Sequence, residues 1–145
     1  MSDITQQVGT KAAASSTILV VEPDILVRMV VADYLRGCGY AVVEGVNADD
    51  ALTILRAKIP VHILLTEVRL RGSADGFGLA QHVRRHFPGI DVILTSNADS
   101  VANKAKDICD DGLSQKPYHP HEIVRRINLL REQRHVTHSD AFRNL

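Results

Sequence analysis

The chain has 145 residues, of which 45% are hydrophobic and only 4% aromatic, so its length suits one domain with an aliphatic core. Its 17 Lys and Arg residues balance 17 Asp and Glu residues, and this neutrality argues against a general nucleic-acid binder, which carries a basic excess. The sequence has neither a run of about 18 apolar residues for a membrane span nor the n-region of a secretory signal. We therefore expect a cytoplasmic protein without membrane or nucleic-acid partners.

Hydrophobic periodicity predicts strands and helices that alternate along the chain. Residues 1–16 are rich in Ser, Thr, Gln and Ala and are expected to form a flexible arm. Strands are predicted within residues 16–24, 40–45, 61–66 and 90–96, and a very short one before Lys116. Helices are predicted within residues 25–40, 48–58, 76–87, 98–109 and 121–134. The polar tail, residues 135–145, is expected to be loose.

Capping residues and breakers set the expected helix ends. Asn47 and Asp75 can each cap the helix that follows, and Gly39 and Pro60 are stop signals. In the first helix, Met29 is among the residues expected to face the core. Five strands alternating with five helices predict an α/β fold, a doubly wound parallel sheet with helices on both faces.

The two cysteines, Cys38 and Cys109, lie far apart in the sequence and lack the spacing of a metal site. They suit a reducing cytoplasm, and we interpret both as small buried hydrophobic residues. The seven histidines form no recognisable zinc motif, because no Cys or acid completes the spacing. No metal site is predicted from these residues.

Polar side chains follow the predicted strands at the points where the strands end. In an open parallel sheet, ligands bind outside the carboxyl ends of the strands. Each such residue alone has an ordinary explanation as a boundary residue, a helix cap or a surface lysine. Together they indicate a site that contains Glu22, Asp24, Thr66, Glu67, Thr95, Ser96, Asn97 and Lys116.

These strand ends resemble the receiver (CheY-like) domain of bacterial two-component response regulators. The resemblance rests on ILVVEPDILVR for the first strand and acidic turn, ILLTEVRLRGSADGF for the phosphoacceptor strand, DVILTSNAD for the switch strand and QKPY for the Lys-Pro motif. It implies a flavodoxin-like (βα)5 fold with a five-stranded sheet of order 2-1-3-4-5. It covers a receiver domain at residues 17–134, between the arm at 1–16 and the tail at 135–145.

The resemblance also implies roles for residues of the site. Glu67 stands where the family has its phosphorylated Asp, so a Glu at the phosphoacceptor position makes this receiver atypical. Ser96 stands at the hydroxyl residue that binds the phosphoryl group, and Lys116 at the lysine that binds it from the other side. Leu113 stands at the aromatic switch position, so a rotating Tyr or Phe is absent.

The acidic pocket departs from the family pattern too. Glu22 stands at the first residue of the acidic pair, but Pro23 stands at the second, a Mg²⁺ ligand, and offers no side-chain oxygen. Whether Asp24, one place further on, replaces that ligand is left open. Mg²⁺ needs near-octahedral oxygen ligation, and a shift of about 1 Å at a reacting group can cost about 10²-fold in rate. We therefore expect no cofactor, with Mg²⁺ bound weakly at most.

The implied function is that of a stand-alone atypical receiver in two-component (phosphorelay) signalling. Glu67 would be a fixed negative charge that mimics an aspartyl phosphate incompletely, because a phosphoryl group brings about −1.5 to −2 charge. No second domain follows, so output is expected through protein contacts, and the chain is not expected to be an enzyme. The expected partners are a histidine kinase or another signalling protein, and homodimerisation is left open.

Three alternatives remain at this point. The chain could be a conventional receiver that still accepts phosphate with Mg²⁺, or a retired receiver that serves as a scaffold. From another class, the same sheet could host a small hydrolase or a nucleotide-binding protein. No GxGxxG, P-loop or GxSxG motif supports that last reading.

Overall fold

The computed structural model of the protein describes residues 16–110 and 120–143. Its centre is a parallel sheet with the order β2-β1-β3-β4. The strands are β1 (Thr17–Val21), β2 (Ala41–Gly45), β3 (Ile63–Glu67) and β4 (Asp91–Thr95). The predicted α/β class and parallel sheet are confirmed, with the expected order for these four strands. The fifth predicted strand falls outside the described residues.

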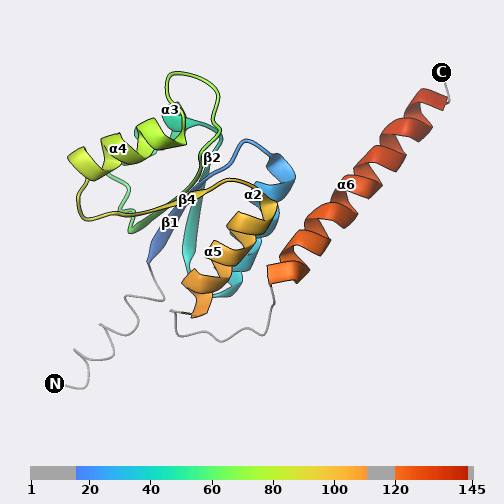
Figure 1. Cartoon of the computed structure of the whole chain (residues 1–145), viewed down its shortest axis with the longest axis horizontal. Coiled ribbons are helices and arrows are strands. Elements are labelled where there is room, and N and C mark those ends of the chain that lie inside the picture. The colour runs from blue at the N-terminus through green and yellow to red at the C-terminus, as the bar shows by residue number, and fades with distance from the viewer. Residues whose placement is uncertain (1–15, 111–119, 144–145) are drawn as a thin grey trace.

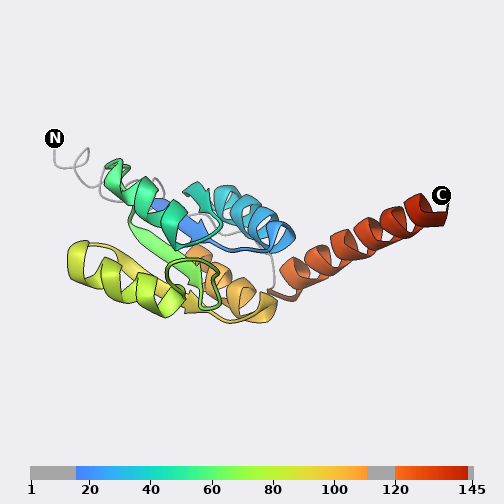
Figure 2. The same cartoon turned by 90° about the horizontal axis from the view of Figure 1, so that it is seen from above.

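Helices cover both faces of the sheet (Figures 1 and 2). They are α2 (Ile25–Gly37), α3 (Ala48–Arg56), α4 (Gly76–His86), α5 (Ala98–Asp110) and α6 (Pro120–Arg143). Helices α2 and α5 pack on one face together with the start of α6, and α3 and α4 pack on the other. The sheet is therefore doubly wound, as predicted.

The central strands are apolar throughout because both of their faces are covered. Side chains of β1 alternate between the two cores: Ile18 and Val20 face α2 and α5, whereas Leu19 and Val21 face α3 and α4. All four are at most 1% exposed. Burial of these side chains fixes the register of β1 and thereby the place where the chain leaves the sheet at residue 22.

Both predicted caps are confirmed. The Asn47 side chain accepts a hydrogen bond from the Asp50 amide at 2.9 Å, and the Asp75 side chain accepts one from the Gly78 amide at 2.8 Å. The inward orientation predicted for Met29 is wrong, because its side chain is 51% exposed. The buried residues of α2 are Val27, Val30, Val31, Ala32, Tyr34 and Leu35.

The last helix is longer than predicted. Ile123 and Ile127 are buried as expected, but α6 continues to Arg143 instead of ending at Arg134. The loose tail predicted from residue 135 is thus helical up to Arg143. No Gly or Pro occurs between residues 121 and 143 to stop the helix. In both views this part of α6 extends away from the sheet (Figures 1 and 2). The domain boundaries themselves stay predictions.

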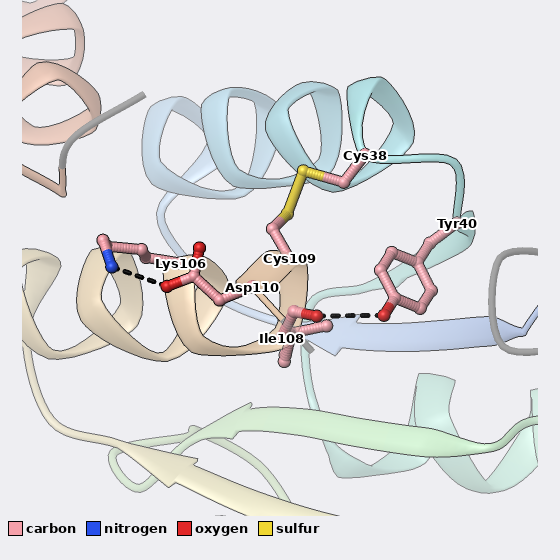
Figure 3. The surroundings of a disulfide bond; sticks show 6 residues. All are labelled: Cys38, Tyr40, Lys106, Ile108, Cys109 and Asp110. Atoms are coloured by element: carbon pink, nitrogen blue, oxygen red, sulfur yellow. Dashed lines mark hydrogen bonds and ion pairs between the residues drawn. A yellow bond between two sulfur atoms is a disulfide. The ribbon is translucent and has the colours of Figure 1, made fainter. Parts of the chain in front are cut away.

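The two cysteines form a disulfide, so the inference of a reducing compartment from these cysteines is wrong. Cys38 follows the end of α2 and Cys109 lies in the last turn of α5, with their Cα atoms 5.7 Å apart (Figure 3). Both are buried, as predicted. A separation of 71 residues in sequence concealed this proximity, which arises because α2 and α5 pack on the same face. The Tyr40 hydroxyl donates a hydrogen bond to the Ile108 carbonyl at 2.9 Å beside the disulfide.

Candidate functional site

Buried polar side chains gather at the carboxyl ends of the strands. Among the residues that the structure describes, four polar or charged residues are buried: Glu22 after β1, Thr66 and Glu67 at the end of β3, and Thr95 at the end of β4. The two carboxylates are each 7% exposed. Buried charge is costly unless it is paired or hydrogen-bonded, so the partners of Glu22 and Glu67 define what the site can do.

Glu22 is an acid with an unusual protonation equilibrium. Burial raises its pKa from 4.5 to about 7, against the lowering effect of a hydrogen bond from the Asp24 amide, and the nearby Glu67 carboxylate raises it further. That amide lies 3.0 Å from Oε2 of Glu22. Near neutral pH a substantial fraction of Glu22 is therefore protonated, and the site holds less negative charge than its sequence suggests.

This equilibrium makes stability depend on pH. Because the folded-state pKa lies above the ordinary value, the native state binds more protons than the unfolded state between about pH 4.5 and 7. Glu22 therefore contributes stability that is lost as pH rises through that range. We expect Glu22→Gln to remove this loss, with a difference below about 3 kcal/mol because residual hydration weakens the effect. Urea melts of both proteins at pH 5, 6, 7 and 8 measure it, and parallel stability curves would contradict it.

Both carboxylate oxygens of Asp24 are engaged by other parts of the protein. Its Oδ1 atom caps α2 by accepting hydrogen bonds from the amides of Leu26 at 2.9 Å and Val27 at 3.4 Å. Its Oδ2 atom pairs with the Arg131 guanidinium of α6. Burial acts to raise the pKa of Asp24, but the bonds from Arg131 and from the two amides outweigh burial and lower it. Asp24 is thus ionised and engaged with α2 and α6.

Glu67 is held by the residue two places further along. Its Oε1 atom accepts a hydrogen bond from the Arg69 amide at 3.2 Å and lies 3.5 Å from the Nε atom of Arg69. The same guanidinium donates from Nη2 to the Ser96 carbonyl at 2.5 Å. Arg69 therefore links the end of β3 to the end of β4.

Gly76 lets α4 start directly against the end of β3. Its amide donates to the Val68 carbonyl at 2.9 Å. A Cβ atom at this position would lie 2.1 Å from the carbonyl oxygen of Glu67 and 2.6 Å from the Cα atom of Val68. The close approach leaves room only for glycine, and it fixes the backbone that carries the Glu67 carboxylate.

Ser96 lies exposed at the end of β4, beside the start of α5. Its amide donates to the Ser100 hydroxyl at 3.1 Å, and the Asn97 side chain accepts from the Ser100 amide at 2.8 Å. Glu22, Glu67 and Ser96 thus lie at the carboxyl ends of their strands, and the roles that the family resemblance assigns to them stay predictions. Two other predicted site residues, Leu113 and Lys116, lie outside the described residues.

Two arginines of the site were missed from the sequence. Arg69 follows the phosphoacceptor position by two residues, and a cation so near a buried acid was a usable signal. Arg131 lies 107 residues from Asp24 in sequence, and nothing in the sequence pattern pairs them.

The donor set does not fit Mg²⁺. Each of the three carboxylates, Glu22, Asp24 and Glu67, already accepts hydrogen bonds from the protein. Glu22 is partly neutralised, and Pro23 supplies no side-chain oxygen. Within residues 16–110 and 120–143, no three His, Cys, Asp or Glu side chains group in a way that could hold a metal ion. We therefore derive no step through a metal ion.

Comparison with known proteins establishes the family. Residues 18–128 match the response regulator receiver domain, so the chain belongs to the receiver family of two-component signalling. It is 33% identical over 126 residues to the transcriptional regulatory protein AruR of Pseudomonas aeruginosa, covering 82% of this chain and 51% of AruR. It is 30% identical over 130 residues to the probable transcriptional regulator ycf27 of Cyanophora paradoxa, covering 88% of this chain and 53% of ycf27.

Solved structures show the same fold. The RcsB–DNA complex matches 82% of this chain and 61% of the RcsB chain with a TM-score of 0.54 and 20% identity. The isolated receiver domain of RcsB from Salmonella enterica serovar Typhimurium matches 81% of this chain and 89% of that chain, also at 0.54. The chain spans about half the length of the two curated relatives it matches. These relatives are regulators, which are signalling proteins and not enzymes.

The expectation that nucleic acid plays no part is contradicted. Two relatives are transcriptional regulators, and RcsB was solved in a complex with DNA. The balanced charge of this chain reports only on its own surface, so it carries no information on whether a receiver serves transcription. In the described part of the chain, no helix has the length and apolar character needed to cross a membrane.

Proposed function

We propose that the protein is an atypical receiver that signals without phosphorylation, with Glu67 as a fixed negative charge. The observation that carries this proposal is the Glu67 carboxylate itself. It is buried to 7% exposure, and its Oε1 atom is already within 3.5 Å of a guanidinium that also bonds the Ser96 carbonyl. Through Arg69, the Glu67 carboxylate is thus linked to the end of β4 without any phosphoryl group.

The surroundings of Glu67 also disfavour phosphoryl transfer. Transfer onto a carboxylate requires an attacking oxygen in line and neutralisation of the phosphate charge. The Glu side chain displaces its oxygens by one methylene relative to Asp, and misplacement by about 1 Å can cost about 10²-fold in rate. Because the carboxylates of the pocket are engaged by protein donors, Mg²⁺ is expected to bind weakly. Ser96 and Lys116 keep the phosphoryl-binding roles that the family resemblance assigns to them, with Glu67 in place of the phosphoryl group.

The proposed output is protein contact that serves regulation of transcription. Its support is the names of the relatives, two of which are transcriptional regulators, and the RcsB–DNA complex. In this proposal the receiver controls a DNA-binding partner in the cytoplasm and has no enzymatic activity of its own. A histidine kinase or another signalling protein is the upstream partner, and a second copy of the chain is a further candidate.

Intact-mass measurement after incubation with acetyl phosphate and Mg²⁺ tests the proposal. We expect the mass of the protein to stay unchanged, because Glu67 is displaced relative to Asp and Pro23 leaves the metal site incomplete. A matched sample without Mg²⁺ controls for non-specific acetylation or phosphorylation. Stoichiometric gain of one phosphoryl group would show a conventional receiver and overturn the proposal.

A further inference from the structure

Arg69 joins the two strand ends of the candidate site. We propose that its guanidinium is a built-in cation that couples the charge of Glu67 to the first turn of α5. This inference rests on the proposed function, because it takes Glu67 as the permanent charge of the site. Arg69 is a positioning residue here, since it acts through Glu67 and Ser96.

The first half of the coupling is the contact with Glu67. Both the backbone amide and the Nε atom of Arg69 face the Oε1 atom of Glu67, at 3.2 and 3.5 Å. The Glu67 side chain is 8% exposed, whereas the Arg69 side chain is 79% exposed. The Glu67 carboxylate is therefore held in place by the fold, and the Arg69 guanidinium lies on its solvent side. The position of Glu67 thus sets the position of the guanidinium.

The second half is the contact with the end of β4. The Nη2 atom of Arg69 bonds the Ser96 carbonyl at 2.5 Å, and the peptide bond of that carbonyl continues into Asn97. The Asn97 side chain caps the Ser100 amide in the first turn of α5, and the Ser100 hydroxyl accepts from the Ser96 amide. A change in the guanidinium position therefore reaches the start of α5 through one carbonyl.

A guanidinium suits this place better than a metal ion does. Its planar group carries a charge and several donors, and here it forms an ion pair with one carboxylate oxygen and donates a hydrogen bond to one carbonyl oxygen. The carboxylates of the pocket, by contrast, do not fit Mg²⁺. Exposed ion pairs contribute little to stability, so the expected effect of Arg69 is on the geometry of the strand ends and not on folding.

A double-mutant cycle read by NMR tests the coupling. The variants are Arg69→Gln, Glu67→Gln and both together, and the readout is the backbone amide of Asn97, which shares its peptide group with the Ser96 carbonyl. We expect each single change to shift this amide resonance several times more than Arg71→Gln does. Arg71 is a matched control, since it lies exposed in the same loop and forms neither contact. In the Arg69→Gln background, Glu67→Gln should cause no further shift at Asn97.

The outcomes separate this inference from the proposed function. The coupling role of Arg69 would be overturned if the Asn97 shift of the double variant equalled the sum of the two single-variant shifts. It would also be overturned if Arg69→Gln shifted this amide no more than Arg71→Gln does. That result would leave the absence of phosphoryl uptake untouched. Conversely, phosphoryl uptake by the unmodified protein would overturn the fixed-charge function, and a non-additive cycle would still show that Glu67 and Ser96 communicate through Arg69. Thermal melts of all variants check that each remains folded.

Discussion

Removal of the Cys38–Cys109 disulfide is expected to lower the free energy of unfolding by about 4 kcal/mol. The bond closes a loop between residues 71 apart in the sequence, and loss of such a crosslink increases the conformational entropy of the unfolded chain by roughly that amount. The bond also joins the ends of two helices, α2 and α5, that pack against each other in one core. Urea denaturation of the oxidised protein and of Cys38→Ala/Cys109→Ala measures the difference.

The reduced wild-type protein is the matched control for this comparison. With dithiothreitol present throughout, its stability should fall to near that of the double variant, since both then lack the crosslink. Alanine is chosen because a serine hydroxyl at these positions, which are 1% and 3% exposed, would add an unrelated cost of burying a polar group. Equal stability of the oxidised and reduced wild-type proteins would contradict the expected contribution of the disulfide.

The disulfide also shows where sequence reasoning reached its limit. Local signals succeeded: short apolar and β-branched runs placed the four described strands, and Asn47 and Asp75 marked the starts of their helices. The Cys38–Cys109 pair depends instead on which face of the sheet α5 covers. A hydrophobic pattern states that a helix is amphipathic but not which neighbour it meets, so this pairing was out of reach.

Within the site, too, local features could be predicted from the sequence, whereas contacts that depend on tertiary packing could not. The end of a strand is a local property, and Glu22, Glu67 and Ser96 could be placed at one edge because parallel strands end there together. The capture of Asp24 by Arg131 depends on how α6 lies against α2, which no local pattern encodes. Arg69 is intermediate, because its nearness to Glu67 is local whereas its bond to the Ser96 carbonyl requires β3 and β4 to be neighbours.

At this strand edge, donors of the protein itself engage the three carboxylates. Asp24, the residue that could have replaced the ligand missing at Pro23, is tied to α2 and Arg131. Glu67 is tied to Arg69. The carboxylates that the family resemblance assigns to a cation are thus satisfied within the chain, and a metal ion would have to compete with fixed donors for each of them.

The double change Pro23→Asp with Glu67→Asp is expected to strengthen Mg²⁺ binding and to permit phosphoryl uptake. Pro23 lies exposed between β1 and α2, so Pro23→Asp adds a carboxylate without disturbing the core. Glu67→Asp shortens the side chain by one methylene and moves its carboxylate away from the Arg69 guanidinium. We expect Mg²⁺ affinity to rise at least about tenfold by titration calorimetry, equivalent to about 1.4 kcal/mol. Uptake of one phosphoryl group from acetyl phosphate, which is not expected for the unmodified protein, should become detectable by intact mass.

Pro23→Ala with Glu67→Asp is the matched control for that double change, because it removes the proline ring but supplies no oxygen. This control should bind Mg²⁺ as weakly as the unmodified protein, since near-octahedral ligation still lacks one carboxylate. If the alanine control gained the same affinity, the missing oxygen at position 23 would not be the obstacle. If the double variant bound Mg²⁺ no better than the unmodified protein, the ion pairs of Asp24 with Arg131 and of the residue-67 carboxylate with Arg69 would be the obstacle. Adding Arg69→Gln to the double variant should then free the residue-67 carboxylate and raise Mg²⁺ affinity.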